Sequence, residues 1–349
     1  IIPSLFPFFV LSSLVVELGM SRYLGRLLEG VMAPLFRVGG ACSSALALGF
    51  VGGYPVGART AIALYENGQC SKTEAERLLA FCNNSGPAFI LGVVGTGIFA
   101  SSRAGLLLYL AHIAASLCVG LLFRFYRPGE GPRPGRHAAP QFQAASFPVA
   151  FTHSITGALS STLNICAFVL FFTVVIRMLF LSGVMGALAG GAAALLSPLG
   201  LDQAWAQRLI TGLLELSSGV SSLTGAGTVT GRLSMAAFML GWAGLSVHCQ
   251  VLAFLGDSGL SMRTYLTGKL LHGGLSALLM GALAPRLIPA LSVSACLAQQ
   301  TEAIAGQEAL RALALSAAAA WVLWLCFLAL AAFPGKKAVE KPKRLRYNR

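Results

Sequence analysis

Polar side chains in this sequence gather at glycine- and serine-rich interruptions of otherwise apolar stretches. The first half is interrupted at Gly49–Gly57 and Asn83–Pro87, and the second half at Ser217–Gly227 and Gly241–Gln250. Amides, hydroxyls, an imidazole and a guanidinium suit the binding of a small polar solute. We predict that the solute is bound by Tyr54, Arg59, Thr60, Asn83, Asn84, Ser85, Ser218, Ser221, Ser222, Thr224, Ser246, His248 and Gln250.

Three ionisable residues at these interruptions have alternative interpretations. Arg59 faces a substrate, or it snorkels toward the lipid headgroups. Glu215 is a candidate for coupling to H⁺ or Na⁺, or it pairs with an arginine. His248 lines the same cavity, or it is a hydrogen-bonded core histidine. The serine and threonine clusters also have a structural alternative, because hydroxyls form hydrogen bonds between membrane helices.

The sequence carries no motif of a common catalytic or nucleotide-binding site. The run Gly92-Val-Val-Gly-Thr-Gly97 is not followed by the Gly-Lys-Ser/Thr of a P-loop. HExxH, GxSxG and metal-spaced His/Cys clusters do not occur, and none of the eight cysteines forms a CxxC pair. We therefore expect no enzyme activity, no metal centre and no cofactor, and we expect the thiols to be buried and inert.

The interruptions lie in a chain that is too apolar for a water-soluble particle. Of its 349 residues, 56% are hydrophobic and 11% are charged, and the mean hydropathy is +0.75. Soluble domains carry about 25% charged residues. Apolar runs of about 18 residues predict membrane spans, which must be helical because open strands leave backbone groups unpaired in lipid. The clearest runs are Leu106–Phe123, Leu163–Leu181, Ser182–Leu199 and Leu313–Phe333.

The net charge of +13 is concentrated at helix ends and in two segments, residues 124–136 and 336–349. Positively charged segments stay on the cytoplasmic side of a membrane, so we place both in the cytoplasm. The basic tail is a topology signal or, alternatively, a contact for anionic lipid. Residues 1–18 have no basic n-region, so we expect no signal peptide. The lipid bilayer, and not nucleic acid, is the partner that this composition predicts.

The two halves of the chain repeat one another at an offset of 160 residues. At this offset Arg103 meets Arg263 and His112 meets His272. We expect the arginines to anchor at the membrane interface and the histidines to form hydrogen bonds with a neighbouring helix. The predicted organisation is a first membrane repeat (1–126), a Pro/Gly-rich cytoplasmic linker (127–146), a second membrane repeat (147–287), a polar connection (288–312), an extra transmembrane helix (313–333) and a basic cytoplasmic tail (334–349).

Interrupted helices at matching places of two repeats indicate a transport protein. A broken helix frees backbone N–H and C=O groups, which are costly in lipid unless protein or a water-filled cavity satisfies them. Such paired interruptions are the best sequence indication of a transporter binding site. The N-termini of the half-helices then direct partial positive charge at an anionic group.

Four motifs resemble a known family. They are Pro3-Ser-Leu-Phe-Pro-Phe-Phe9, Gly52-Gly-Tyr-Pro-Val-Gly-Ala58, Cys82-Asn-Asn-Ser-Gly-Pro-Ala-Phe89 and Gly244-Leu-Ser-Val-His-Cys-Gln250. The similarity is to the YlbJ (SpoVV) family of sporulation integral membrane proteins, in the nucleoside-recognition (Gate) superfamily, and it runs over most of residues 1–290. The resemblance implies an all-α polytopic fold like that of concentrative nucleoside transporters, with two inverted repeats that each contain a re-entrant hairpin and a broken helix. It implies hairpin tips near Gly52–Thr60 and Ser217–Gly227, and broken helices at Asn83–Ser85 and Gly244–Gln250.

The resemblance also implies a role in endospore formation, in which dipicolinic acid crosses the outer forespore membrane of a spore-forming bacterium. Dipicolinate is a flat pyridine with two carboxylates, which suits helix N-termini, asparagine amides, hydroxyls and Arg59. A nucleoside favours carboxylates for its ribose, and Glu215 is the only acidic residue near the interruptions.

We therefore expect a transporter of a small anionic metabolite that works by alternating access at the repeat interface. A transporter of nucleosides or other metabolites is one alternative, and a non-transporting membrane scaffold for spore assembly is another. The sequence leaves the coupling ion, the transport direction and the oligomeric state open, a homo-oligomer included. It also leaves open whether the membrane is the outer forespore or the cell membrane.

Overall fold

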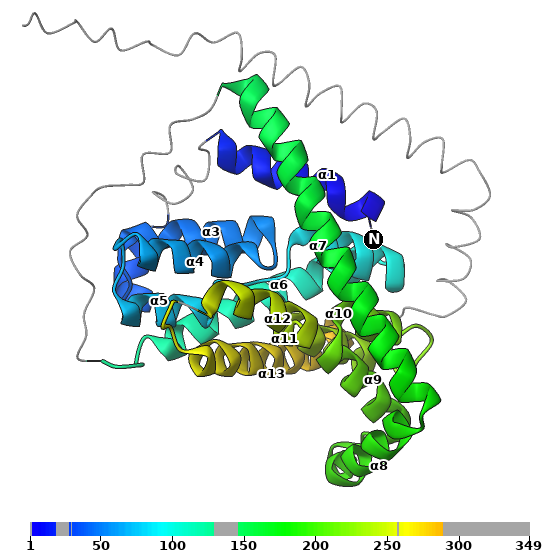
Figure 1. Ribbon diagram of the computed structural model, residues 1–349. Helices are drawn as coiled ribbons and strands as arrows, with labels where there is room; N and C mark the ends of the chain where they lie inside the picture. The colour runs from blue at the N-terminus through cyan, green and yellow to red at the C-terminus, as the bar shows by residue number, and fades with distance from the viewer. Residues whose placement is uncertain (1, 19–27, 29, 129–145, 257, 289–349) are drawn as a thin grey trace, which may run out of the picture. The chain divides into compact units, whose positions relative to one another are not determined.

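The computed structural model describes residues 2–18, 28, 30–128, 146–256 and 258–288, which all belong to one unit, Ile1–Cys296. Every element in these ranges is helical (Figure 1). Four spans are long and apolar enough to cross a membrane: Ser102–Phe123, Phe147–Leu181, Val229–Leu255 and Met262–Leu287. A fifth is obtained if the helices Gly30–Phe36 and Gly40–Gly52, which are bent by 100° relative to each other, are counted together as one span. The chain is thus an all-α, multi-pass membrane protein, as predicted.

Several sequence predictions lie outside the described residues. They concern the linker residues 129–145, the connection from residue 289 onward, the extra transmembrane helix at 313–333 and the basic tail. These boundaries stay predictions.

The first repeat contains a helical hairpin and a broken helix. Its elements are α1 (Ile2–Glu17), η1 (Gly40–Cys42), α3 (Ser43–Gly52), α4 (Val56–Glu66), α5 (Lys72–Leu79), the π-helical segment η2 (Ala88–Ile98) and α6 (Ser102–Phe123). The helices α3 and α4 pack side by side and meet at a tip formed by Gly53–Pro55. The segment Ala80–Pro87 separates α5 from η2, and we call it break 1.

The second repeat follows the same order. Its elements are α7 (Phe147–Leu181), α8 (Val184–Leu196), η3 (Ser197–Leu199), α9 (Gln203–Leu214), α10 (Leu216–Ser221), α11 (Val229–Trp242), α12 (Leu245–Leu255) and α13 (Met262–Leu287). Helices α9 and α10 form the second hairpin, and Ala243–Gly244, which we call break 2, separates α11 from α12.

Two sequence predictions about the second repeat are wrong. The run Ser182–Leu199 is not a span, because its helix α8 has 13 residues, fewer than the roughly 18 that a bilayer requires. The hairpin tip lies at Glu215 and not within Ser217–Gly227, because Leu216–Ser221 is itself the helical second arm. The serines, which we read as an interruption, continue a helix that the Glu215 carboxylate caps.

The 160-residue offset corresponds to equivalent positions in space. Ser101 caps α6 by accepting a hydrogen bond from the amide of Ala104, and Ser261 caps α13 in the same way with Thr264. The rings of His112 and His272 lie 4.3 Å apart between centroids, and His272 Nε2 donates to the His112 carbonyl oxygen over 2.9 Å. Equivalent residues of two repeats touch only near the axis that relates them, so α6 and α13 cross at that axis.

Small residues allow the central helices to approach closely. A Cβ atom added to Gly241 of α11 would lie 2.6 Å from the Cα of Gly273 on α13. Gly95 of η2 and Gly105 of α6 make a similar contact. This is the usual way in which membrane helices gain packing energy, since lipid tails are as apolar as the side chains.

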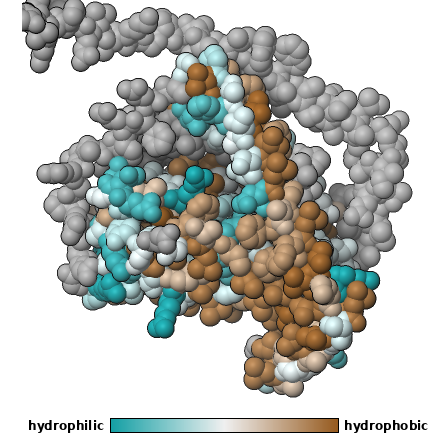
Figure 2. All heavy atoms as spheres, in the orientation of Figure 1, coloured by the Kyte–Doolittle hydropathy of each residue, from teal (hydrophilic) through white to brown (hydrophobic). Residues whose placement is uncertain are grey.

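Helices α1 and α7 form a pair of their own, in which α1 packs mainly against α7. Much of α7 is uncovered, with Leu170, Phe171 and Leu181 each more than 60% exposed. Figure 2 shows hydrophobic atoms over the lower part of α7 and over α8 and α9. Surfaces of this kind suit contact with lipid tails.

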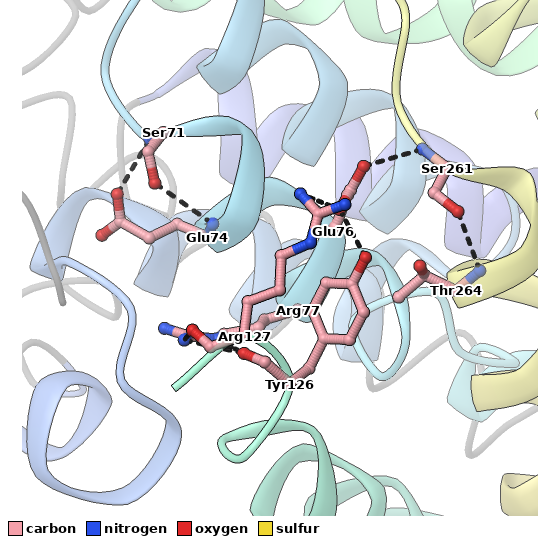
Figure 3. A network of polar contacts seen from close by, with 8 residues as sticks. All are labelled: Ser71, Glu74, Glu76, Arg77, Tyr126, Arg127, Ser261 and Thr264. Atoms are coloured by element: carbon pink, nitrogen blue, oxygen red, sulfur yellow. Dashed lines mark hydrogen bonds and ion pairs between the residues drawn. The ribbon is translucent and has the colours of Figure 1, made fainter. Parts of the chain in front are cut away.

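The short helix α5 holds three buried charges in a network of backbone contacts (Figure 3). The guanidinium of Arg77 donates to the carbonyl oxygens of Arg37, Tyr126 and Arg127 over 2.7–3.0 Å. Glu76 accepts from the hydroxyl of Tyr126 and from the amide of Ser261. The network ties α5 to the end of α6 and the start of α13, and so it fixes the residues that enter break 1.

Candidate functional site

Break 1 passes between the two arms of the first hairpin. The carbonyl of Cys82 lies between Gly49 on α3 and Gly57 on α4, and a Cβ atom on either glycine would overlap its oxygen. Asn83 Oδ1 accepts from the amide of Ala58 over 3.4 Å, and Gly86 packs against Gly53 at the hairpin tip. Glycine at these places is therefore a condition for the break to reach the tip.

Break 2 reaches the tip of the second hairpin in a similar way. Ala243 and Gly244 both have positive φ, 81° and 84°, which ends α11 and turns the chain into α12. A Cβ atom on Gly244 would lie 3.0 Å from the amide nitrogen of Leu216, next to Glu215. Each repeat therefore brings its broken helix onto the tip of its own hairpin.

The two tips, break 1 and the N-terminal half of α12 line one pocket of about 700 Å³, which includes its open mouth. The hairpin tips contribute Gly53 and Tyr54 from the first repeat and Glu215 to Ser217 from the second. Break 1 contributes Ser85 and Gly86, and α12, which begins directly after break 2, contributes Ser246, Val247 and Gln250. Phe9 of α1 and Ile165 and Val169 of α7 close another side, so the pocket lies between the α1–α7 pair and the hairpins.

Two helix N-termini at the pocket have no side-chain cap. The first turn of η2 contributes Ala88 and Phe89 to the lining, and the first turn of α12 contributes Ser246 and Val247. The N-caps of these helices, Pro87 and Gly244, make no side-chain cap hydrogen bond. In contrast, Glu215 caps α10 by accepting from the amides of Ser217 and Ser218 over 2.9 and 2.6 Å. Uncapped N-termini present partial positive charge.

A buried lysine lies directly behind the first tip. The Nζ atom of Lys269 on α13 donates to the hydroxyl oxygen of Tyr54 and to the carbonyl oxygen of Asn83, both over 2.9 Å, and to Nδ1 of His272 over 3.3 Å. Tyr54 in turn donates to the carbonyl oxygen of Leu240 over 2.7 Å. Within the described ranges the ion pairs are Arg127–Glu76 and His153–Glu17, so no carboxylate there pairs with Lys269.

Lys269 and its neighbour Tyr265 are not among the residues predicted from the sequence. Tyr265 accepts from Asn83 Nδ2 over 3.3 Å, and its hydroxyl forms a hydrogen bond of 3.1 Å with Nδ1 of His248. The signal for Lys269 was present, since a lysine inside an apolar closing helix is an intramembrane charge and marks function by default. Nothing in the sequence pattern points to Tyr265.

Comparison with known proteins identifies the chain. Residues 1–127 match the Gate family model, described as nucleoside recognition. The sporulation integral membrane protein YlbJ of Bacillus subtilis (strain 168) is 32% identical over 295 residues, which cover 78% of this chain and 71% of that protein. This chain belongs to the YlbJ family.

The fold of this YlbJ-family chain resembles that of a transporter. A structure of CNTnw in an intermediate state aligns with a TM-score of 0.59 and 16% identity, over 80% of this chain and 74% of that one. A structure of CNTnw in an outward-facing state gives a TM-score of 0.55 and 16% identity, over 83% and 75%. At this identity the likeness shows the fold alone, which is the CNT-like fold that we predicted. A transporter-like fold accords with the expectation that the chain is no enzyme.

Five of the predicted residues line the pocket of the YlbJ-family chain. These are Tyr54, Ser85, Glu215, Ser246 and Gln250. Gln250 is 4% exposed and its Oε1 atom has no hydrogen-bond partner in the described part of the chain.

Three others, Asn83, Asn84 and His248, are buried behind the pocket. Asn84 donates to the carbonyl oxygen of Phe81, and its Oδ1 atom has no partner among the described residues. His248 packs edge-on against Trp242, and its Nε2 atom has no partner within the same ranges. These residues therefore connect the breaks to the protein interior.

The remaining predicted residues lie away from the pocket lining. Arg59 is exposed on α4 and stacks on the ring of Phe254, with 5.5 Å between Cζ and the centroid. Thr60, Ser222 and Thr224 donate to carbonyl oxygens of their own helix or turn, and Ser221 is exposed. The Ser218 hydroxyl is within 3.3 Å of that of Thr173 on α7. For Ser218 this contact agrees with the structural alternative given above, in which hydroxyls form hydrogen bonds between membrane helices.

Proposed function

We propose that this YlbJ-family protein carries a small anionic metabolite through the pocket by alternating access, and that dipicolinate is the first compound to test. The observation that carries the proposal is the pair of uncapped helix N-termini, η2 and α12, in one pocket. Each directs the partial positive charge of a helix N-terminus at a bound anion. One N-terminus comes from each repeat, which suits a ligand with two carboxylates.

The apolar part of the lining supports an aromatic ligand. Phe9, Phe89 and Tyr54 line the pocket together with Ile165 and Val169. A flat ring gains contact energy between such side chains, while the amide of Gln250 offers hydrogen bonds. The ammonium of Lys269, one side chain behind Tyr54, adds positive potential.

The kinship with a sporulation protein supports a place for this transport in spore formation. The YlbJ relative is named for sporulation, and a membrane between mother cell and forespore is where a metabolite for the spore must cross. We therefore propose the outer forespore membrane as the site of action.

Glu215 favours a second candidate, a nucleoside. Its carboxylate lines the pocket, and carboxylate oxygens accept hydrogen bonds from ribose hydroxyls. The Gate model is described as nucleoside recognition, which points the same way. Glu215 also stays our candidate for coupling to H⁺ or Na⁺.

The test is uptake by purified protein in liposomes, with dipicolinate and nucleosides measured side by side. We expect dipicolinate uptake that Ser246→Asp reduces at least roughly tenfold, because a carboxylate at the N-terminus of α12 repels an anion and occupies its N–H groups. The matched control Ser246→Asn has nearly the same shape without the charge and should keep most uptake.

Each other outcome selects an alternative. Nucleoside uptake that Glu215→Gln abolishes would replace dipicolinate by the second candidate. Uptake of neither compound, with spore formation that tolerates alanine at Tyr54, Ser246 and Gln250, would favour the membrane scaffold.

A further inference from the structure

The Lys269 ammonium occupies a cage built from three separate elements. Its acceptors are the Tyr54 hydroxyl oxygen at the first hairpin tip, the Asn83 carbonyl oxygen in break 1 and Nδ1 of His272 on α13. The ammonium also lies 4.8 Å from the centroid of the Tyr54 ring. An ammonium has three N–H donors, and each one has an acceptor here.

The cage is electrically one-sided. Its acceptors are neutral groups, and no carboxylate pairs with Lys269 in the described ranges. The tautomers agree with this arrangement: His272 donates from Nε2 to the His112 carbonyl oxygen, which leaves Nδ1 free to accept.

Backbone carbonyls at a broken membrane helix are the groups that coordinate the coupling cation in many transporters. The Asn83 carbonyl in break 1 is such a group, and here it accepts a hydrogen bond from a cation that is part of the chain, the Lys269 ammonium. We propose that Lys269 is a tethered cation: its ammonium fills the cation position at break 1, so that the folded protein binds no Na⁺ there and holds the tip to the break without one.

The second repeat has no counterpart to this cage. At the offset of 160 residues, Tyr109 corresponds to Lys269 and Ala243 corresponds to Asn83. Break 2 is held by the close approach of Gly244 to the second tip. The tethered cation therefore holds break 1 and not break 2, and it is not a consequence of the duplication.

The proposal concerns binding, and only its consequence for transport rests on the proposed function. The test is thermal unfolding of the purified full-length protein. Lys269→Ala removes the ammonium and leaves a cavity beside three unpaired acceptors. We expect its Tm to fall by roughly 4 °C or more, and we expect n-propylammonium, which restores the three missing carbons and the donors, to recover at least half of the loss.

Two controls separate charge from volume. Lys269→Met fills the cavity without donors and should lose Tm without recovery by n-propylammonium. Met280→Ala opens a buried apolar cavity elsewhere on α13 and should not respond to the ammonium either. Equal recovery of Lys269→Ala and Met280→Ala would overturn the proposal.

The wild-type protein supplies a measurement that does not depend on any variant folding. NaCl and choline chloride at equal ionic strength should give the same Tm, and a rise specific to Na⁺ that Tyr54→Phe, which removes the hydroxyl acceptor of the cage, leaves unchanged would place Na⁺ binding elsewhere, in agreement with the proposal. A Na⁺-specific rise that Lys269→Met enlarges also agrees with it, whereas one that Lys269→Met abolishes contradicts it. Failure of dipicolinate uptake would refute the proposed substrate and leave these unfolding results intact.

Discussion

Both breaks bring an interrupted helix to the tip of a hairpin, but different groups stabilise them. Break 1 is held by side chains: Lys269 binds the Asn83 carbonyl oxygen, Ser116 donates to that of Phe81, and His112 accepts from the amide of Ser85. Break 2 is two residues long and turns through the positive φ values of Ala243 and Gly244.

This difference shows which properties the duplication preserved. Both repeats keep a hairpin whose tip meets a broken helix through glycine, because that contact depends on backbone approach. Of the side chains that hold break 1, His112 and Ser116 have equivalents in His272 and Ser276, whereas Lys269 has none, and it brings its ammonium to one side of the pocket only. The repeated hairpins and broken helices therefore form a symmetric backbone, whereas the electrostatic potential differs between the two sides of the pocket.

The largest effect should come from the feature that the repeats share. Gly49→Ala would push a methyl group into the Cys82 carbonyl, and Gly219→Ala would push one into the backbone of Gly212. Since both obstacles are backbone, we expect each to cost about 3 kcal/mol or more, or to prevent folding. Size-exclusion profiles and Tm provide the measurement. Gly92→Ala, where a Cβ atom meets nothing within 4 Å, is the control and should fold normally.

The next effect should distinguish the two repeats. Lys269→Met leaves the Tyr54 oxygen, the Asn83 carbonyl and His272 Nδ1 without their donor, and an unpaired buried polar group costs about 1–3 kcal/mol. We expect unfolding by denaturant to show a loss within or above this range. The equivalent change in the first repeat, Tyr109→Phe, should stay within about 0.5 kcal/mol. Similar losses at both positions would contradict the asymmetry.

A finer test uses two equivalent serines that are both fully buried. Ser116 donates to the Phe81 carbonyl oxygen over 2.7 Å, whereas Ser276 Oγ has no partner among the described residues. Ser116→Ala should destabilise by about 1 kcal/mol, and Ser276→Ala should be neutral or stabilising, since it removes an unpaired hydroxyl. A comparison of the Tm of the two variants is sufficient. A larger fall in Tm for Ser276→Ala than for Ser116→Ala would show that break 2 has polar support of its own.

The smallest effect should be that of Arg59→Ala. Arg59 is exposed and contacts the Phe254 ring, an interaction worth about 0.5–1 kcal/mol at such a site. We expect near-normal Tm and dipicolinate uptake in liposomes. Loss of uptake in a stably folded Arg59→Ala protein would instead restore the substrate-facing role that the sequence suggested.

The sequence by itself determined the class of protein and the position of most interruptions. Low charge content requires lipid around the helices, and glycine, proline and serine clusters mark places where a helix cannot continue. For this reason the closing helix α6 and break 1 were predictable. Where serines occupy positions compatible with a helix, as in α10, the same reasoning misplaced the tip. The spacing of His112 and His272 revealed the repeat, although not that the two rings touch.

Only the tertiary structure decided which polar groups meet. Lys269 and Tyr54 are 215 residues apart, and Lys269 and Asn83 are 186 apart, so no local pattern relates them. The same holds for α5, whose charges suggest a solvated face but are buried against the backbone of other segments. Composition and periodicity indicate whether a segment faces lipid or water, because this exposure depends on residues that are close together in the sequence. Partnerships inside the protein depend on how the repeats cross, and they appear only when the helices pack.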